Sequence, residues 1–410
     1  MAQSRTDSYR TAVARTLAWL ERMMPAQDGS EGVYERYRIN VGQINPWVRP
    51  DCSIEVGRLF YAAGAWQNQP HHRSRGERLA RFVLSLQRKA PGWYEGSFPF
   101  YLFHPFKPGA ADIGDRFGIP NLPDRAWPND NGKITERLFW FYRQTGDRAY
   151  LDAGRRASDY LLRTQAADGT FSVSEDGEDS GFKGADFVIW PTLALAHGAL
   201  ATGSEAYRAG ALRGLRWLRD HQHPSGRMLT SYETASVEAW RPPSSETVGA
   251  LKVFAVGARL FDQDEDGWVK ESLSGLAGAV LNWQHESGAI RNCDGDSVTA
   301  SLQNDPDVTD LVYTDGYALV ALLEAYAATR SEELLRAAQR LADWLVSVQC
   351  WGEADAWDGG WRGSYHLISQ TWFGSADQEN ELDEGGLNSV YTGWTAAPIG
   401  FGLLQLLQAS

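Results

Sequence analysis

The chain has 410 residues, with 52 acidic and 39 basic side chains and a formal net charge of −13. This charge argues against binding to nucleic acid or to an anionic membrane surface, because both interactions depend on basic side chains. No apolar run approaches the roughly 20 residues of a membrane-spanning helix. The first residues contain no apolar segment of the kind that directs export, so we expect a cytoplasmic protein.

Cysteine is scarce and aromatic residues are plentiful. The three cysteines, Cys52, Cys293 and Cys350, are widely spaced, and none belongs to a CxxC pair. The sequence therefore predicts neither a thiolate metal site nor a disulfide scaffold, and we expect a chain without a metal or a cofactor. The chain also contains 17 Trp, 16 Tyr and 16 Phe residues. Because tryptophan packs well against flat ligands, the positions of the tryptophans are informative.

One sequence unit recurs along the whole chain: a helical stretch that ends in Gln, with a Gly a few residues later. Successive Gln residues of this unit lie between 57 and 78 residues apart. Six copies in register predict an architecture built from six similar units. The copies are Gln27…Gly29, Gln87…Gly92, Gln165…Gly169, Gln222…Gly226, Gln284…Gly288 and Gln349…Gly352.

Each Gln is predicted to end an amphipathic helix, as in residues 335–348, where apolar and charged side chains take opposite faces. Between these helices, more uniformly apolar helices are predicted at about 53–66, 131–145, 190–202, 245–260, 315–329 and 388–408. A helix that is apolar on all sides is buried. The alternation therefore predicts an all-α fold: a single (α/α)6 barrel of six inner and six outer helices over residues 1–410. Strand signals, such as residues 170–173, are limited to small hairpins in loops.

The predicted connections differ in length at the two ends of the barrel. Connections from an inner to an outer helix are mostly short, whereas those from an outer to an inner helix have about 20 to 40 residues. In an alternating ring all long connections emerge at one end, which we expect to form a broad mouth. Eight of the 17 tryptophans lie in these connections: Trp47, Trp93, Trp127, Trp240, Trp351, Trp357, Trp361 and Trp372.

Acidic residues cluster where the long connections enter the inner helices. Glycoside chemistry needs two carboxyl groups, one of which is kept protonated by its surroundings. For each acid, helix capping is an alternative role, because helix starts favour acidic side chains. The candidate catalytic residues are Asp130, Asp186, Asp51, Glu246 and Asp315, with Glu55 and Asp310 nearby in the sequence.

Aromatic and cationic residues at the mouth are candidates for contact with a sugar, since sugar rings combine an apolar face with hydroxyl edges. Arginines could also receive a carboxylate of the substrate, although pairing with the neighbouring acids is an equal alternative. The candidate substrate-binding residues are Trp47, Arg49, Trp127, Trp190, Trp240, Arg241, Trp361, Arg362, His366 and Trp394. Residues 262–267 (DQDEDG) begin like a calcium loop, but position twelve is Leu273 where such a loop has Glu, so a plain turn is favoured.

The repeat resembles that of the six-hairpin glycosidase superfamily, and the likeness covers essentially the whole chain. It is carried by residues 130–133 (DNGK), 145–151 (TGDRAYL) and 165–169 (QAADG), and by 314–317 (TDGY) followed by 345–349 (LVSVQ). Within this superfamily, unsaturated glucuronyl and galacturonyl hydrolases carry essential aspartates at the starts of two consecutive inner helices. The resemblance implies that Asp130 and Asp186 protonate an enol-ether double bond and activate water.

The leading hypothesis is a glycoside hydrolase that acts on a sugar or oligosaccharide, including substrates with uronic acids, as a monomer or homodimer. The alternative is a sugar epimerase or isomerase of the N-acylglucosamine 2-epimerase type on the same barrel. That chemistry uses paired histidines at the axis, and His197 and His366 are the only plausible pair. A non-catalytic glycan-binding barrel would have an aromatic mouth without two facing carboxyl groups. A terpene or prenyl-transfer barrel would share the Gln–Gly repeat, but an acid-rich mouth with arginines suits sugars better.

Overall fold

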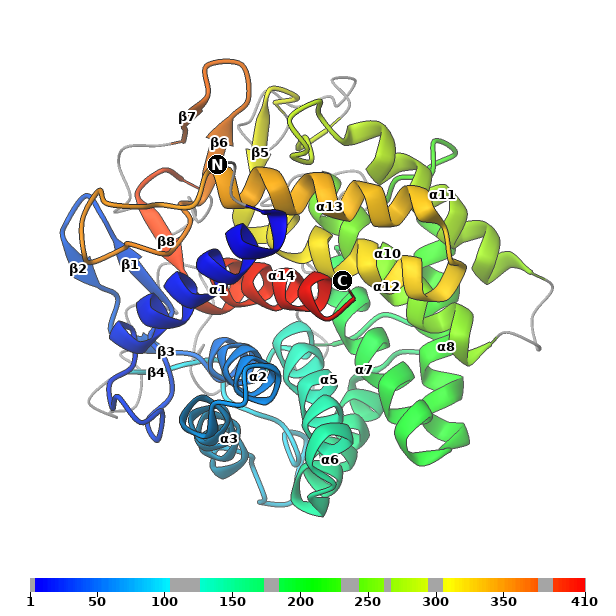
Figure 1. Ribbon diagram of the computed structural model, residues 1–410. Coiled ribbons are helices and arrows are strands. Elements are labelled where there is room, and N and C mark those ends of the chain that lie inside the picture. The colour runs from blue at the N-terminus through cyan, green and yellow to red at the C-terminus, as the bar shows by residue number, and fades with distance from the viewer. Residues whose placement is uncertain are drawn as a thin grey trace.

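Helices alternate along the chain between an inner and an outer ring (Figure 1). The computed structural model describes residues 4–103, 126–172, 184–229, 243–261, 267–293, 305–374 and 386–409. In these ranges the inner helices are α2 (Pro50–Trp66), α5 (Pro128–Thr145), α7 (Asp186–Thr202), α10 (Pro243–Leu260), α12 (Gly316–Thr329) and α14 (Ala397–Ala409). The outer helices are α1 (Arg5–Arg22), α3 (Pro70–Ser85), α6 (Arg148–Thr164), α8 (Glu205–Asp220), α11 (Trp268–Trp283) and α13 (Glu332–Ser347).

The inner ring is closed. Each inner helix packs against the next one along the chain, and α14 packs against both α12 and α2. Each outer helix from α3 onward lies against the inner helix that precedes it, whereas α1 lies against α14. The first outer helix therefore completes the last unit of the ring, and the predicted (α/α)6 barrel is confirmed.

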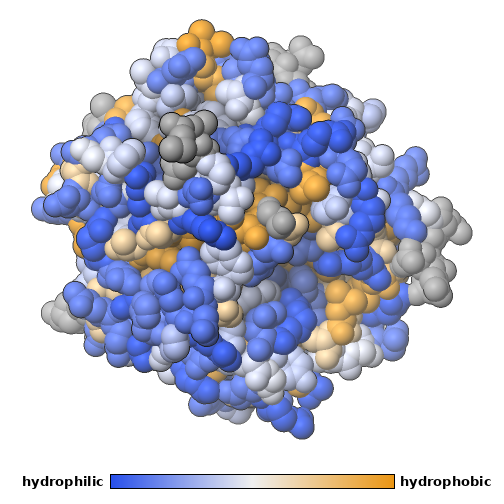
Figure 2. Space-filling view, viewed as in Figure 1, coloured by the Kyte–Doolittle hydropathy of each residue, from blue (hydrophilic) through white to orange (hydrophobic). Residues whose placement is uncertain are grey.

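The polarity of the helices explains which ring each one joins. In α12 every residue from Gly316 to Leu323 is buried, as expected for a helix with almost no polar face. By contrast, α13 buries one stripe that runs from Leu334 to Leu345 and exposes charged residues on the other side. Figure 2 shows the result on one side of the molecule, where hydrophilic residues cover most of the surface and apolar residues show between them.

The Gln–Gly repeat joins neighbouring outer helices. Gln284, which follows α11, donates from its side-chain amide to the carbonyls of Gly288 in its own loop and Ala337 in α13, both at 2.9 Å. Gly288 has φ +106°, and a Cβ there would lie 2.2 Å from the carbonyl oxygen of Arg340, so only glycine allows this approach. Gln87, Gln222 and Gln349 make the same two-carbonyl contact, and Gln349 reaches α1.

In two copies the sequence selected the wrong glycine. The glycine that accepts from Gln87 is Gly96 rather than Gly92, and the one that accepts from Gln349 is Gly359 rather than Gly352. Their loops are longer than in the other copies, so a glycine nearer to the Gln was mistaken for the repeat position.

Three short sheets lie in the long connections. Strand β1 (Arg36–Arg38) pairs with β2 (Gln43–Ile44) and β8 (Ser389–Tyr391), and β3 (Trp47–Val48) pairs with β4 (Leu102–Phe103). Strand β6 (Ser364–His366) pairs with β5 (Val308–Asp310) and β7 (Thr371–Trp372). In addition, Phe171 forms an isolated bridge with Gln165. Within the described residues the strands are short and confined to the connections, as expected, but only the β1–β2 and β6–β7 pairings are hairpins. The other pairings join segments that are distant in the sequence.

The start of the last inner helix differs from the prediction. A helix was expected over 388–408, but Ser389–Tyr391 is strand β8, and a π-helical turn, η4 (Thr392–Ala396), precedes α14. The residues of β8 are buried and continue the apolar pattern of the helix that follows, so the sequence predicts a helix there. Their pairing with β1, which is far away in the sequence, makes them a strand instead.

At the opposite end, short turns join inner to outer helices. Gly146 and Gly203 end α5 and α7 with φ +71° and +69°, the left-handed conformation that favours glycine. Because these turns are tight and the sheets lie at the other end, the mouth of the barrel is the end with room for a site. None of the described helices is long and apolar enough to span a membrane.

Candidate functional site at the mouth of the barrel

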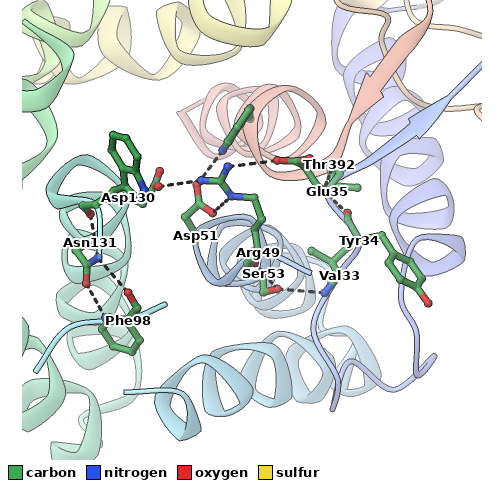
Figure 3. Close-up of polar contacts among 12 residues, drawn as sticks. Val33, Tyr34, Glu35, Arg49, Asp51, Ser53, Phe98, Asp130, Asn131 and Thr392 are labelled. Carbon is green, nitrogen blue, oxygen red and sulfur yellow. Dashed lines mark hydrogen bonds and ion pairs between the residues drawn. The ribbon is translucent and has the colours of Figure 1, made fainter. Parts of the chain in front are cut away.

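Arg49 is the centre of a buried ion-pair cluster at the start of two inner helices (Figure 3). It lies between β3 and α2, and its guanidinium group contacts three carboxylates. Nε is 3.1 Å from Asp51 Oδ1, Nη1 is 3.3 Å from Glu35 Oε1, and Nη2 is 2.9 Å from Asp130 Oδ2. All four side chains are buried. The predicted candidates Asp51 and Asp130 are thus brought together, and Arg49 is their shared counterion.

Aromatic rings enclose this cluster. The Arg49 guanidinium carbon lies 4.1 Å from the ring centroid of Phe100 and 4.5 Å from that of Trp394. Trp394 Nε1 also donates to Asp51 Oδ2 at 2.8 Å. Burial alone would raise the pKa of Asp51, but Arg49, Lys133 and this hydrogen bond outweigh burial, so the pKa lies below its usual value. Asp51 is therefore an ionised carboxylate at neutral pH.

Lys133, one turn after Asp130 on α5, is surrounded by aromatic rings. Its Nζ lies 5.2 Å from the ring centroid of Trp190, 5.3 Å from that of Trp394 and 5.8 Å from that of Tyr317. Trp190 and Tyr317 are also in contact, with 4.9 Å between their centroids. The ammonium group is thus held by the negative faces of three rings as well as by nearby carboxylates.

A small pocket opens beside these rings. Its lining includes two of the predicted carboxylates, Asp186 at the start of α7 and Glu246 in the first turn of α10. Asn129 Nδ2 donates to Asp186 Oδ2 at 3.2 Å, which fixes the orientation of this carboxylate. The remaining lining residues are Lys133, Ile189, Trp190, Ser245, Gly249, Tyr313 and Tyr317. Two carboxylates from neighbouring inner helices, one basic group and three aromatic rings therefore share one concave surface.

Beneath the pocket, charged side chains continue along the barrel axis. Arg137 is ion-paired with Glu55 and Glu136, and Arg58 is ion-paired with Glu55. Lys252 Nζ lies 4.0 Å from Glu136 Oε2. Burial and the neighbouring Arg137 and Arg58 hold the pKa of Lys252 well below its usual value. The two arginines thus balance the charges of the two glutamates.

Asp315 lies apart from this group. Its Oδ1 accepts the Ile290 N–H at 3.1 Å, and its Oδ2 is 2.5 Å from Thr309 Oγ1. This position recurs in other units: Asn131 accepts the Phe98 N–H, Thr247 accepts the Met228 N–H, and Ser53 accepts the Val33 N–H. Asp315 therefore holds the loop of its unit, and we leave it out of the candidate catalytic group.

Three of the predicted tryptophans of the connections, Trp47, Trp127 and Trp361, differ in their surroundings. Trp47 stacks on Tyr101 at 5.4 Å between centroids, and Trp127 lies 5.7 Å from Phe100, so both belong to the wall of the mouth. Trp361 is fully buried, and its Nε1 donates to Leu345 O at 2.8 Å. It occupies the position two residues after the repeat glycine, as Phe98 and Ile290 do in other units, and therefore packs in the core rather than facing a substrate.

The remaining candidates lie outside the pocket. Arg362 is ion-paired with Glu353 on the connection before β6. His366 is on β6 and contacts Ser369, whereas His197 is buried in α7, 3.7 Å from Glu136 Oε1. The predicted histidine pair is thus not brought together. Trp240 and Arg241, and most of the calcium-like stretch 262–267, lie outside the described residues. Within the described ranges, no three His, Cys, Asp or Glu side chains converge as metal ligands would.

Several residues of the site were not among the predicted candidates: Glu35, Phe100, Lys133, Tyr313 and Tyr317. For Lys133 a signal existed, because it follows Asp130 by three residues and so lies on the same face of the helix. For Tyr317 the analogous signal is its place in the first turn of an inner helix. Glu35 and Phe100 lie in irregular connections, where periodicity gives no information about direction.

The barrel was compared with known proteins. No sequence family model matches the chain, and no curated protein matches it in sequence. Solved structures do match it. A cellobiose 2-epimerase from Bacillus thermoamylovorans is 10% identical with a TM-score of 0.71, and the match covers 99% of each chain. A sugar epimerase from a ruminal bacterium is 11% identical with a TM-score of 0.72 over 99% of each chain.

Hydrolases match as well. An unsaturated glucuronyl hydrolase specific for heparin is 12% identical with a TM-score of 0.64, over 99% of this chain and 97% of the other. The chain therefore has the (α/α)6 barrel fold of these solved structures. This agrees with the resemblance found in the repeat motifs. At such low identity these comparisons establish the (α/α)6 barrel fold, and the chemistry has to be argued from the pocket.

Proposed function

We propose that the chain is a carbohydrate-active enzyme, and specifically a glycoside hydrolase that works at the pocket between α5, α7, α10 and α12. The observation that carries the proposal is that Asp186 and Glu246, from neighbouring inner helices, line one pocket with Trp190, Tyr313 and Tyr317. Aromatic rings provide stacking surfaces for a sugar, and paired carboxyl groups provide the acid and the base of glycoside hydrolysis. The solved structures with this fold include carbohydrate-processing enzymes of both hydrolase and epimerase types.

The ion pairs divide the carboxylates into two classes. Asp51 and Asp130 share the Arg49 guanidinium group, which stabilises their ionised forms. Asp186 and Glu246 line the pocket itself, so we assign them the exchange of protons with the substrate. One protonates the departing oxygen, and the other attacks the sugar or activates water. The family resemblance implies a different catalytic pair, Asp130 and Asp186. Asp186 therefore belongs to both candidate pairs.

The pocket also favours a particular substrate class. Lys133 is the basic side chain among the described residues that line the pocket. Its ammonium group lies near the aromatic rings, where a substrate carboxylate could accept a charge-assisted hydrogen bond. This supports a sugar that carries a carboxylate, such as a uronic acid, next to the bond that is cleaved.

An epimerase is the second candidate because three of the matching solved structures are sugar epimerases. The structure does not bring together the histidine pair expected for this chemistry. Among the described residues, His197 is buried in α7, whereas His366 lies on β6. Burial, together with the cationic Arg143 and Lys252, holds the pKa of His197 well below its usual value. Such a histidine is a neutral imidazole, and the carboxylate pair of the pocket favours hydrolysis.

The test is incubation of the full chain with a panel of neutral and uronic-acid-containing oligosaccharides. Products are separated by chromatography and analysed by proton NMR. We expect new reducing ends, and we expect Asp186→Asn and Glu246→Gln each to lower kcat by about a hundredfold or more. Asp220→Asn, which alters an exposed carboxylate of α8, is the matched control and should keep full activity.

The other outcomes contradict parts of the proposal. Interconversion of sugars without new reducing ends would make the chain an epimerase. Loss of turnover in Asp130→Asn but not in Glu246→Gln would assign catalysis to the alternative pair. Binding without any turnover would show a glycan-binding barrel.

A further inference from the structure

A loop on the rim presents one exposed aromatic side chain, Trp351, outside the pocket. Residues 350–360, here called the Trp351 loop, connect α13 to the segment before β6. The Cys350 N–H donates to Gly360 O at 3.0 Å, and the Gly359 N–H donates to Cys350 O at 2.9 Å. Across the loop, the Gly352 N–H donates to Asp358 Oδ1 at 2.7 Å. These bonds close the loop at its base and brace its middle.

The Trp351 loop is also fixed to the outer helix α1. Trp19 Nε1 donates to Ala356 O at 3.0 Å, and Arg22 Nη2 donates to Asp358 O at 2.7 Å. Gly359 has φ +95°, and a Cβ at this residue would lie 2.4 Å from Arg15 O, so the loop rests directly on the helix backbone. A loop that is held in this way loses little conformational entropy when it binds a ligand.

Trp351 is the most exposed large apolar side chain of the described residues, at 69%. The guanidinium carbon of Arg15 lies 3.7 Å from its ring centroid and covers one face. A ring with both faces covered could not be so exposed, so the other face is open to solvent. At the far side of the loop, Trp357 packs on Tyr37 of β1 at 5.8 Å between centroids.

Of the residues that follow Trp351 in the loop, Glu353 and Asp355 are exposed and acidic. Glu353 Oε2 accepts from Trp357 Nε1 at 3.3 Å and is ion-paired with Arg362. The centre of a protein–protein interface is apolar, with few charged residues, and the surroundings of Trp351 do not fit that description. An open indole face on a loop with exposed acidic residues fits a pyranose ring, whose C–H face stacks on indole while its hydroxyls donate to carboxylates. The net charge of −13 disfavours a polyanion.

We propose that the Trp351 loop is a carbohydrate-binding site, separate from the pocket, for an uncharged glycan that stacks on the open face of Trp351. The loop belongs to the same rim as the pocket, because Trp357 contacts β1, and β1 pairs with β8, which leads directly into the turn that carries Trp394. The proposal goes beyond the proposed hydrolysis and does not depend on it, since binding at this loop requires no turnover.

The test is electrophoresis of the full chain through native gels that contain a neutral polysaccharide: hydroxyethyl cellulose, xylan or galactomannan. Polygalacturonate serves as the anionic polymer, and a plain gel as the reference. We expect at least one neutral polymer to retard the wild type. Trp351→Ala should weaken the association roughly fivefold or more, and Trp351→Phe should restore part of it. Leu200→Ala, which removes an exposed apolar side chain from α7, should leave the retardation unchanged.

The proposal is overturned if no neutral polymer retards the wild type, if only polygalacturonate does, or if Trp351→Ala binds as the wild type does. Size-exclusion chromatography of the same proteins is a second measurement. A wild-type dimer that Trp351→Ala dissociates would show that the loop binds a second copy of the chain, and would also overturn the proposal. Failure of the proposed hydrolysis would give a different result: no new reducing ends would form in the activity assay, while the neutral polymer would still retard the protein in the gel.

Discussion

The Arg49 guanidinium group lies 2.9 Å from the Asp130 carboxylate, so the entrance to α2 is tied to the first turn of α5. This contact joins two neighbouring inner helices at the mouth of the barrel. Since Glu35 and Asp51 share the same guanidinium group, one cation compensates three buried carboxylates with help from Lys133. Arg49, which the sequence suggested as a substrate-binding residue, is therefore an internal counterion of the site.

Replacement of Arg49 should destabilise the fold strongly. Arg49→Met leaves Glu35, Asp51 and Asp130 buried without their shared cation, and breaking a buried ion pair costs about 3–5 kcal/mol. Urea unfolding followed by far-UV circular dichroism measures the change. The control is Arg81→Met, which removes an exposed ion pair between α3 and α6 and should cost about 1 kcal/mol or less. Equal stability of the two variants would contradict the role of Arg49.

Asp315 should make the stability of the fold depend on pH. Burial raises its pKa to about 8, against the hydrogen bonds from Thr309 and Ile290. Thr309 Oγ1 lies 2.5 Å from both Ile290 O and Asp315 Oδ2, and a hydroxyl has one proton to donate. If Thr309 donates to Ile290 O, then Asp315 must be protonated and donate to Thr309, which agrees with the raised pKa.

The sign of the pH effect follows from linkage. The folded state keeps the Asp315 proton up to about pH 8, whereas the unfolded chain loses it near pH 4. The stabilisation is therefore complete below about pH 4 and is lost as pH rises toward 8. Asp315→Asn should remove this slope, because Asn131 fills the same position in another unit. Urea unfolding at several pH values between 4 and 9 tests this, and parallel curves for the variant and the wild type would refute it.

The ring architecture was readable from the sequence because each local signal repeats. A helix such as α12 is apolar on all sides and α13 is not, so the two rings separate by periodicity alone. The Gln–Gly unit was readable for the same reason, since its contacts lie within one loop and the next outer helix.

The interior of the site was less predictable because its contacts join distant segments. An acid at a helix start was the sequence signal for both Asp130 and Asp315, yet one contacts Arg49 and the other holds a loop. The difference is one of position in the repeat, because Asp315 takes the place that Asn131, the residue after Asp130, has in its own unit. A shift of one residue at a helix start does not show in the helical spacing of the sequence.

The repeat glycines should tolerate no side chain. Gly288→Ala places a Cβ 2.2 Å from Arg340 O at φ +106°, so we expect a loss of at least about 2 kcal/mol of folding stability. Gly278→Ala in α11 is the matched control, because a Cβ there meets no atom within 4 Å. In a helix interior that change should stabilise by about 0.5–1 kcal/mol. Thermal unfolding of both variants measures the contrast, and opposite signs are the expected result.

Under the proposed function, Lys133 should determine whether the enzyme prefers acidic sugars. In Lys133→Met the aromatic cage keeps a side chain of similar length but loses the charge, so KM for a uronic-acid substrate should rise roughly tenfold or more. The same substrate with its carboxyl group reduced to an alcohol should be affected much less, because it never formed the charged contact. Lys133→Arg should recover part of the affinity for the acidic form. Steady-state kinetics on the matched substrate pair provide the measurement. An equal loss on both substrates would show that Lys133 acts through Asp51 and the ring packing instead of through the substrate carboxylate.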